Sequence, residues 1–238
     1  MIADVVNYRD NRGTGRIMFN KIFQEWQNEI DMVMNQDPWI KKLRGGELDL
    51  CHYKGFLLET YHHAGLNPQI QGYCTLYLKG NPRKIIDLFF RHASSEIGHD
   101  LLALNDLKVL GEDVEKLAGR RPLPSTIAFN AFVLHCIKHV NPLSYLGYLF
   151  HLEFLPTQNG PDYIKILKSM GVPENALTFL EEHATVDIGH NKMMEKYLKD
   201  LIQSEKDLDD IIFAAKSSCR LHTYMIADSM KNGEDLFS

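Results

Sequence analysis

Two histidines and an aspartate recur at helical spacing in the stretch His183-Ala-Thr-Val-Asp187-Ile-Gly-His190. On an α-helix, positions i, i+4 and i+7 fall within one narrow stripe, so these three side chains would converge. Imidazole nitrogens and carboxylate oxygens are ligands for iron, manganese and zinc. Because short motifs often match by chance, the segment alone leaves two readings open, a metal-binding stripe and a solvated helix face.

A second candidate ligand pair is Glu96-Ile-Gly-His99. Residues at i and i+3 of a helix lie on one face, and ExxH on a core-facing helix is a recurrent ligand device of carboxylate-bridged two-metal bundles. The neighbouring apolar residues indicate such a helix, in which an unpaired carboxylate would be costly; they are Phe89, Phe90, Ile97 and Leu101. Taken alone, the pair is more typical of a polar helix face.

A third candidate is Glu153, the only carboxylate in the apolar and aromatic run LSYLGYLFHLEFL. Glutamate is rarely buried without a partner, so this position requires a cation, a proton or a metal ion. The structural alternative is a buried salt bridge with Arg91 or Lys138. His151 is close in sequence but points to another side of the same helix.

Together these segments supply three carboxylates and three imidazoles. Two metal ions with three protein ligands apiece would keep open positions for O₂ and a substrate. The mixture of nitrogen and oxygen donors favours Fe(II) or Mn(II), whereas a structural zinc site would favour thiolates. Three weak signals of matching chemistry therefore predict a two-metal site formed by Glu96, His99, Glu153, His183, Asp187 and His190.

The order ExxH, Glu, HxxxDxxH resembles the heme-oxygenase-like diiron oxidase superfamily. That group includes the iron-containing redox enzymes and is structurally allied to TenA, PqqC and the CADD-like proteins. The resemblance implies a seven-helix α fold, two Fe(II) ions with Mn as an alternative, and O₂ as co-substrate. It also implies a non-heme oxidase or oxygenase acting on a small organic substrate, such as a fatty-acid-like or amino-acid-like metabolite.

A ferritin-like arrangement is an alternative metal architecture, because the chain also reads Glu…ExxH…Glu…DxxH when it is started at Glu59. That pattern uses Glu59 and leaves His183 over, while the first pattern does the reverse. We favour the first pattern, because three aligned ligands on one helix are harder to obtain by accident.

A metal-free enzyme or binding protein on the same fold, similar to TenA or PqqC, is a further alternative. It would leave the six metal-type residues without a role. The sequence does not decide whether Glu59, His62 or His63 contributes to the site.

Helices must position these residues, since apolar residues recur at helical spacing and no segment shows β alternation between turn signals. We expect one all-α domain over residues 1–238, a heme-oxygenase-like bundle of about seven helices. An arm over residues 1–15 and a polar tail over residues 232–238 would flank it. The predicted helices cover about 16–44 with a bend at Asp37-Pro38, 47–64, 67–78, 83–110, 126–140, 143–155, 162–170, 174–202 and 205–230.

The composition indicates which partners to expect. A net charge of −5 gives no electrostatic footprint for nucleic acid, and no apolar run approaches the ~18 residues that span a membrane. The N-terminus lacks the pattern of a signal peptide, and four dispersed cysteines without CxxC suggest reduced thiols. We therefore expect a cytoplasmic protein with a small-molecule substrate and no nucleic-acid or membrane partner. A homodimer would be an ordinary assembly.

Overall fold

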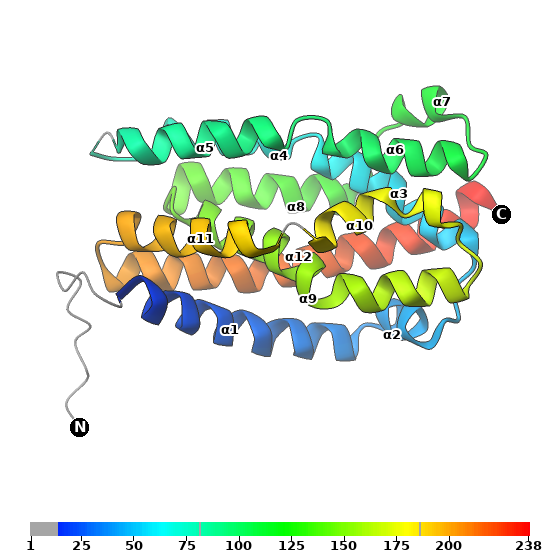
Figure 1. Ribbon diagram of the computed structural model, residues 1–238, viewed down its shortest axis with the longest axis horizontal. Helices are drawn as coiled ribbons and strands as arrows, with labels where there is room; N and C mark the ends of the chain where they lie inside the picture. Colours follow the sequence, from blue (N-terminus) through cyan, green and yellow to red (C-terminus); the bar gives the residue numbers. More distant parts are fainter. Residues whose placement is uncertain (1–13, 81, 186) are drawn as a thin grey trace.

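The computed structural model describes residues 14–80, 82–185 and 187–238, and for residues 14, 185 and 187–192 it describes the backbone alone. Within these residues the regular structure is helical, which confirms the all-α class, with twelve α-helices rather than about seven (Figure 1). The elements are α1 (Thr14–Gln36), α2 (Pro38–Gly45), α3 (Leu50–Ala64), α4 (Asn67–Thr75), α5 (Arg83–Ser95), α6 (His99–Val109), α7 (Val114–Ala118), α8 (Pro124–His135), the π-helical η1 (Cys136–Val140), α9 (Ser144–Ser169), the 3₁₀-helical η2 (Glu174–Ala176), α10 (Thr178–Thr185), α11 (Asp187–Leu201) and α12 (Glu205–Phe237).

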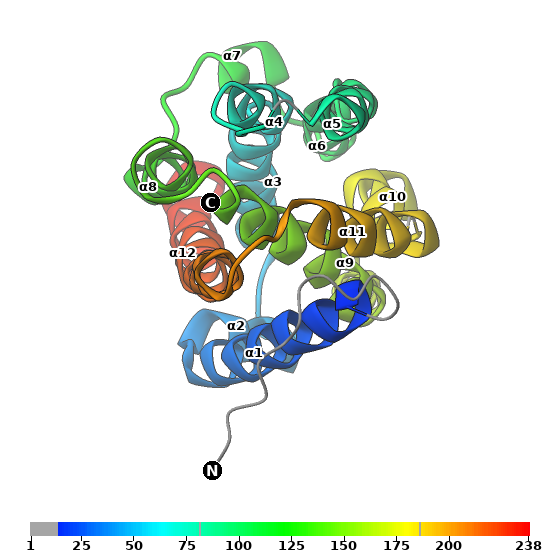
Figure 2. The ribbon, with the colours of Figure 1, turned by 90° about the vertical axis from the view of Figure 1, so that its left-hand side faces the viewer.

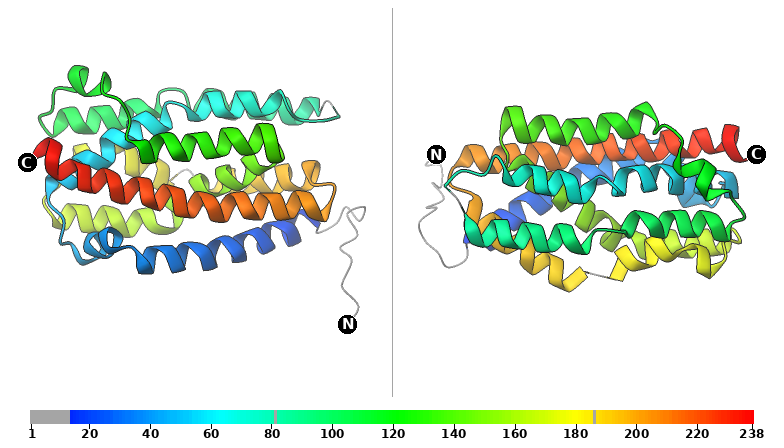
Figure 3. Two further views of the ribbon diagram at one scale, coloured as in Figure 1. Left: turned by 180° about the vertical axis from the view of Figure 1, so that it is seen from behind. Right: turned by 90° about the horizontal axis from the view of Figure 1, so that it is seen from above.

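The longer helices run along one common axis, which Figure 2 views end-on. Seen from behind, α12 lies between α8 and α1 (Figure 3). On its inner side α12 packs against α3 and α9. The core therefore surrounds α9 and α12, whose inward faces are apolar.

An aromatic layer joins α1 to α9. Trp26 is fully buried, and its ring lies 6.0 Å from Phe150 and 6.3 Å from Phe154, measured between centroids. Phe19 meets the same two phenylalanines edge-on or tilted at 5.5 and 5.4 Å. Such tilted and edge-to-face geometries are favourable for aromatic pairs and add to the burial of their surface. This layer fixes the position of the helix that carries Glu153.

Two glycines allow α12 to approach its neighbours closely. A Cβ atom built on Gly147 of α9 would lie 2.1 Å from the carbonyl oxygen of Ile211, and one on Gly55 of α3 would lie 2.2 Å from that of Ser229. Real Cβ atoms do not approach a carbonyl oxygen so closely, so backbone contact between these helices requires glycine at both positions.

The prediction of a polar tail over residues 232–238 was wrong, because α12 continues to Phe237. Gly233 lies against the backbone of Cys51, and Leu236 and Phe237 pack on the core. Contacts with residues distant in the sequence stabilise this last turn. Of the predicted arm, residues 1–13 lie outside the described part of the chain.

The predicted helix over residues 83–110 is two helices. Gly98 adopts a left-handed conformation with φ of +95°, and the chain turns there between α5 and α6. Glu96 is the C-cap of α5, while His99 is the first residue of α6. Glycine tolerates positive φ at no steric cost, which explains the break within an otherwise helical pattern.

The predicted break at Pro156 and Pro161 was also wrong, because both prolines lie inside the continuous helix α9. Proline removes one helical hydrogen bond and disfavours the preceding turn. The hydroxyl of Thr157 donates to the carbonyl oxygens of Glu153 and Phe154 at 3.2 and 3.0 Å, which compensates locally. Buried contacts on both sides of the prolines, at Leu155 and Leu167, account for its continuity.

The predicted helix over residues 174–202 is divided into η2, α10 and α11, with residue 186 outside the described part. His183 therefore belongs to α10, whereas Asp187 and His190 belong to the first turn of α11. In the described ranges, no helix has both the length and the apolar character needed to cross a membrane.

Candidate metal centre

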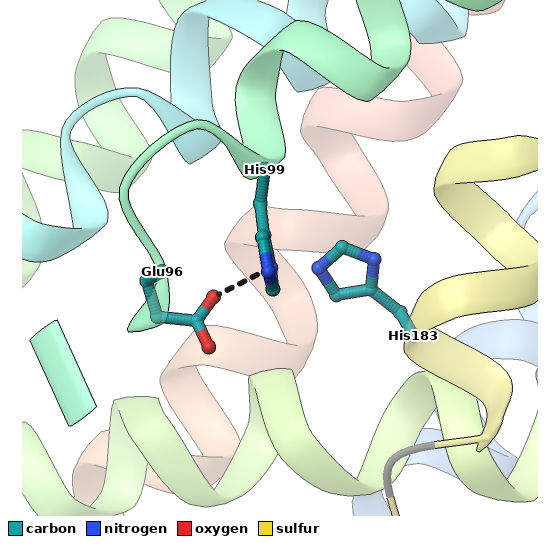
Figure 4. Close-up of side chains that lie close together, drawn as sticks. All are labelled: Glu96, His99 and His183. Carbon is teal, nitrogen blue, oxygen red and sulfur yellow. Dashed lines mark ion pairs between the residues drawn. The ribbon is translucent and has the colours of Figure 1, made fainter. Parts of the chain in front are cut away.

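Three of the predicted ligands, Glu96, His99 and His183, converge in the structure. One donor atom from each lies within 4.8 Å of the other two. Figure 4 shows them arriving from the turn after α5, the start of α6 and the helix α10. The imidazole rings of His99 and His183 stand nearly perpendicular, at 85°, with centroids 5.1 Å apart. Residues that the sequence separates by more than 80 positions thus form one cluster.

The turn at Gly98 brings Glu96 and His99 together. His99 Nδ1 lies 3.2 Å from Glu96 Oε2, and the backbone N–H of His99 donates to the carbonyl oxygen of Glu96 at 3.3 Å. Their i, i+3 proximity is as predicted, but a turn between two helices creates it. A helix would have separated the two side chains by a fixed angle, whereas the turn lets both point toward α10.

His183 is oriented by the carbonyl oxygen of Phe179, to which its Nδ1–H donates at 2.7 Å. Its ring also stacks on the Phe179 ring, with centroids 4.2 Å apart. Burial lowers the pKa of His183, so the imidazole is neutral at pH 7 with its lone pair on Nε2. Metal-binding histidines commonly have this arrangement, in which the second ring nitrogen donates to a backbone carbonyl.

Asp106 fixes the start of the helix that carries His183. This fully buried carboxylate on α6 accepts from the backbone N–H of Thr178 at 3.1 Å, from that of Phe179 at 3.0 Å, and from the Thr178 hydroxyl at 2.6 Å. These donors are the first groups of α10, which have no partner within their own helix. Asp106 therefore ties the helix of His99 to the helix of His183.

Replacing Asp106 with alanine is expected to lower the free energy of unfolding by about 2–3 kcal/mol, because buried N–H groups lose their acceptor. Asp113 is a matched control, since it caps the short helix α7 through one exposed bond to the Lys116 N–H. Asp113→Ala should cost at most about 1 kcal/mol. Urea unfolding measures both, and equal costs would argue against a special role for Asp106.

Glu153 meets the cluster through His92, a residue to which the sequence analysis gave no role. His92 Nε2 lies 3.2 Å from Glu153 Oε1 and 3.5 Å from Glu96 Oε1. Burial would lower the pKa of His92, but its contacts with the two carboxylates raise it to about 9. The signal that could have found it is its i, i+4 spacing to Glu96. His92 is thus the nearby cation for Glu153, where Arg91 or Lys138 had been suggested.

The remaining two predicted ligands, Asp187 and His190, lie in α11 with side chains outside the described part of the structure. Their role as ligands stays a prediction. The described backbone places them in the first turn of the helix that follows α10, three residues apart.

The geometry of the triad fits a bound metal ion. Two ligand atoms about 2.1 Å from one ion are about 3 Å apart when adjacent and about 4.2 Å apart when opposite. The 3.2 Å between Glu96 and His99 matches adjacent ligands, and the 4.8 Å limit of the triad requires only a small contraction. The buried Nδ1 atom of His99 lies 3.2 Å from the Glu96 carboxylate without a well-aligned hydrogen bond, an arrangement that suits two ligands of one ion. The donor set suits Fe(II), Mn(II) or Zn(II).

The triad lines an internal cavity of about 170 Å³. Most of the other lining residues are apolar or aromatic, and they come from helices on several sides of the bundle. A cavity of about this size, when lined by apolar side chains, can hold a benzene-sized molecule. The apolar lining includes Ile40, Leu43, Leu48, Phe56, Tyr145, Leu149, Leu167, Phe179 and Leu180.

Glu59 has a structural role. Its Oε2 accepts from the backbone N–H of Leu123 at 3.0 Å and from the Thr126 hydroxyl, both at the start of α8, and the residue is 2% exposed. Among the described residues it is not part of the cluster that could hold a metal. The ferritin-like alternative, which depends on Glu59, therefore lacks geometric support.

Three other histidines, the buried His63 and His151 and the half-buried His222, lie together near the same cavity. Burial lowers the pKa of His63 to about 4 and that of His151 to about 3, and burial together with its two neighbours lowers that of His222 well below 6.5. All three are therefore neutral in the folded protein at pH 7. In the unfolded chain each would take up a proton below about pH 6.5.

We expect stability to fall as the pH decreases from about 6.5 toward 4, because the unfolded state then binds more protons than the folded state. Each buried histidine contributes at most about 1.4 kcal/mol per pH unit. His92, with its raised pKa, is protonated in the folded state throughout this window, so it opposes the slope near pH 6.5 and adds none below about pH 5.5, where the unfolded chain is protonated as well. Urea unfolding at several pH values measures the slope, and His63→Gln should reduce it by about one proton. An unchanged slope in that variant would contradict the assignment of His63 as a buried neutral group.

Comparisons with known proteins agree with this architecture. The model of a family described as iron-containing redox enzymes matches residues 54–223. A solved domain of unknown function with a heme oxygenase-like fold, from Shewanella denitrificans, is 24% identical with a TM-score of 0.85, covering 92% of this chain and 95% of that one. This likeness confirms the predicted heme-oxygenase-like fold.

Two TenA homologues share the fold at lower identity. The protein from P. horikoshii is 12% identical with a TM-score of 0.71, covering 90% of this chain and 98% of its own. The protein from Pseudomonas syringae pv. tomato is 12% identical with a TM-score of 0.69, covering 90% of this chain and 93% of its own. Among curated proteins, none is significantly similar to this chain.

Proposed function

Because the chain belongs to the family of iron-containing redox enzymes, we propose that it is a non-heme diiron oxidase or oxygenase that uses O₂ to oxidise a small organic substrate. The observation that carries this proposal is the convergence of Glu96, His99 and His183 in the lining of a mostly apolar cavity. Manganese in place of one or both iron ions fits the same donors.

Glu96, His99 and His183 would hold one part of the centre, and Glu153 with Asp187 and His190 would complete it. When bound, two Fe(II) ions supply open coordination positions at which O₂ can be reduced. The protein fixes the donors before metal binds, through the hydrogen bond from His183 to Phe179 and the cap that Asp106 provides for α10. His92, held between Glu96 and Glu153, keeps its proton and balances part of the negative charge of the two carboxylates.

The cavity would bind the substrate beside the metal centre and exclude water from it. Its walls are mostly aliphatic and aromatic, which suits an apolar chain or ring rather than a polar metabolite. This supports a largely apolar substrate over an amino-acid-like one, whose charged ammonium and carboxylate groups would lack a solvated environment.

A metal-free function similar to that of the TenA homologues is the second candidate. The shared fold and the enclosed cavity favour it. It gives no account, however, of why two imidazoles and a carboxylate converge, with the buried His99 Nδ1 facing Glu96 without a well-aligned hydrogen bond. Cys136 does not support nucleophilic catalysis, since burial raises the pKa of its thiol to about 11.

Oxygen consumption by the Fe(II)-loaded protein tests the proposal. The protein, loaded anaerobically with two equivalents of Fe(II), is expected to consume O₂ at least about 10-fold faster than the same Fe(II) in buffer, with a transient visible absorption band. His99→Ala should lose this activity. His135→Ala is the matched control, because His135 is an exposed histidine on α8, and its activity should equal that of the wild type. Equal rates in protein and buffer would refute the oxidase.

A further inference from the structure

A chain of hydrogen bonds fixes the protons on His151, which is buried, and on His222, which is half-buried. The indole N–H of Trp26 can only donate, and it donates to His151 Nδ1 at 3.1 Å. Neutral His151 then carries its proton on Nε2, which lies 2.9 Å from His222 Nδ1 and donates to it. Neutral His222 must in turn carry its proton on Nε2. The two hydrogen bonds, which link Trp26 on α1 to His151 on α9 and His151 to His222 on α12, therefore leave His222 with an N–H donor at Nε2.

His63 carries its proton on the other ring nitrogen, Nδ1. Its Nδ1–H donates to Asn130 Oδ1 at 2.8 Å, so the lone pair is on Nε2. That Nε2 atom is buried and has no hydrogen-bond partner in the protein. Because the residue is only 4% exposed, bulk water does not satisfy it either. An unsatisfied acceptor at such a depth is costly unless a ligand or water occupies it.

The two imidazoles lie side by side on the wall of the cavity. Their centroids are 5.6 Å apart, and each ring stacks on Phe129, at 4.8 Å for His63 and 5.1 Å for His222. Both residues line the cavity that also contains the metal triad. The pair therefore offers one hydrogen-bond acceptor and one donor to the same enclosed space.

The charge around the pair decides what it can bind. Among the described residues lining the cavity there is no lysine or arginine, and the one cation, His92, is already held by Glu96 and Glu153. Burial keeps the pKa of both His63 and His222 low, so neither imidazole is a cation at pH 7. A carboxylate placed here would be buried without a counter-charge, whereas a hydroxyl group could donate to one ring and accept from the other.

We propose that His63 and His222 bind an uncharged hydroxyl group of an otherwise apolar substrate, with the hydroxyl donating to His63 Nε2 and accepting from the Nε2–H of His222. This assignment rests on the proposed function in treating the cavity as the substrate pocket. It does not require that metal be bound, because the histidine relay is formed entirely by protein groups. Within the class of apolar substrates, it selects alcohols over carboxylates at this position.

Binding of three matched probes tests the proposal: 4-fluorobenzyl alcohol, 4-fluorotoluene and 4-fluorobenzoate, titrated into the full-length protein at pH 7.5 and followed by fluorine NMR. His63→Asn keeps an amide near the Nδ1 position and removes the group at Nε2, and His222→Asn does the same on the other ring. Each variant is expected to bind the alcohol roughly fivefold more weakly, as for one lost hydrogen bond, and to bind the toluene within twofold of the wild type. His63→Gln, whose amide reaches the Nε2 position, should recover most of the affinity.

Both His63→Asn and His222→Asn are measured, so that one variant still tests the proposal if the other fails to fold. Equal losses for alcohol and toluene would indicate a packing role and overturn the proposal, as would an unchanged alcohol affinity in both variants. Benzoate affinity that falls in both variants would place a carboxylate at the pair and also overturn it. The iron content of each sample is measured alongside, so failure of the metal centre is recognised separately from failure of this binding site.

Discussion

Replacing His183 with alanine is expected to weaken Fe(II) binding by at least about 100-fold. His183 supplies one of the three donor atoms that already lie within 4.8 Å of each other, and its Nε2 lone pair has no other assigned partner. Loss of groups that merely orient a ligand typically costs 10–100-fold in metal affinity, so loss of a ligand itself should cost more. Anaerobic titration of Fe(II) against a competing chelator measures the affinity.

Glu59→Gln is the control that separates the two diiron architectures. The amide keeps the size of the side chain and an oxygen that can accept from the Leu123 N–H and the Thr126 hydroxyl. We expect its Fe(II) affinity to remain within about threefold of the wild type. The reverse outcome, with weak binding by Glu59→Gln and normal binding by His183→Ala, would support the ferritin-like arrangement.

Replacing Gly147 with alanine is expected to lower the free energy of unfolding by more than about 3 kcal/mol, which places it among the most damaging single substitutions. The new Cβ would meet the carbonyl oxygen of Ile211 at 2.1 Å and the backbone nitrogen of Ala215 at 2.7 Å. Both contacts are with the backbone of α12, which cannot move aside as a flexible side chain could. Separation of α9 from α12 would also disturb Glu153, six residues further along the same helix. Urea unfolding followed by circular dichroism measures the loss.

Gly72 provides the matched comparison, because it is also a helical glycine but has only the Phe90 ring within 4.0 Å of an added Cβ. Gly72→Ala should therefore stabilise the protein by about 0.5–1 kcal/mol through the higher helix propensity of alanine. If Gly147→Ala and Gly72→Ala changed the free energy of unfolding by similar amounts, α9 and α12 would not be packed closely enough at Gly147 to exclude a Cβ atom.

Local sequence patterns were sufficient to predict the all-α class and the triad of Glu96, His99 and His183. Helical periodicity and residue chemistry are properties of short segments, and the ligand types were distinctive enough to recognise far apart in the chain. The precise way in which Glu96 and His99 meet was not predictable, because an isolated glycine within an apolar pattern is compatible with either a helix or a turn. The packing of α5 on α4 and of α6 on α3 favours the turn at Gly98.

The features that were missed depend on contacts between distant segments. α9 continues through Pro156, and α12 continues to Phe237, because surrounding helices bury them, and tertiary packing overrides local propensity. His92 was passed over because its second carboxylate, Glu153, lies on another helix. The relay from Trp26 to His222 joins three helices and has no signature in any one segment.

Iron-edge anomalous diffraction from crystals soaked anaerobically in Fe(II) tests the central claim most directly. Two anomalous peaks are predicted, with at least one of them within about 2.3 Å of donor atoms from Glu96, His99 and His183. Glu153, Asp187 and His190 should complete the coordination of the pair. Absence of any peak at this cluster under saturating Fe(II), or a peak coordinated by Glu59 in its place, would contradict the diiron centre proposed for this protein.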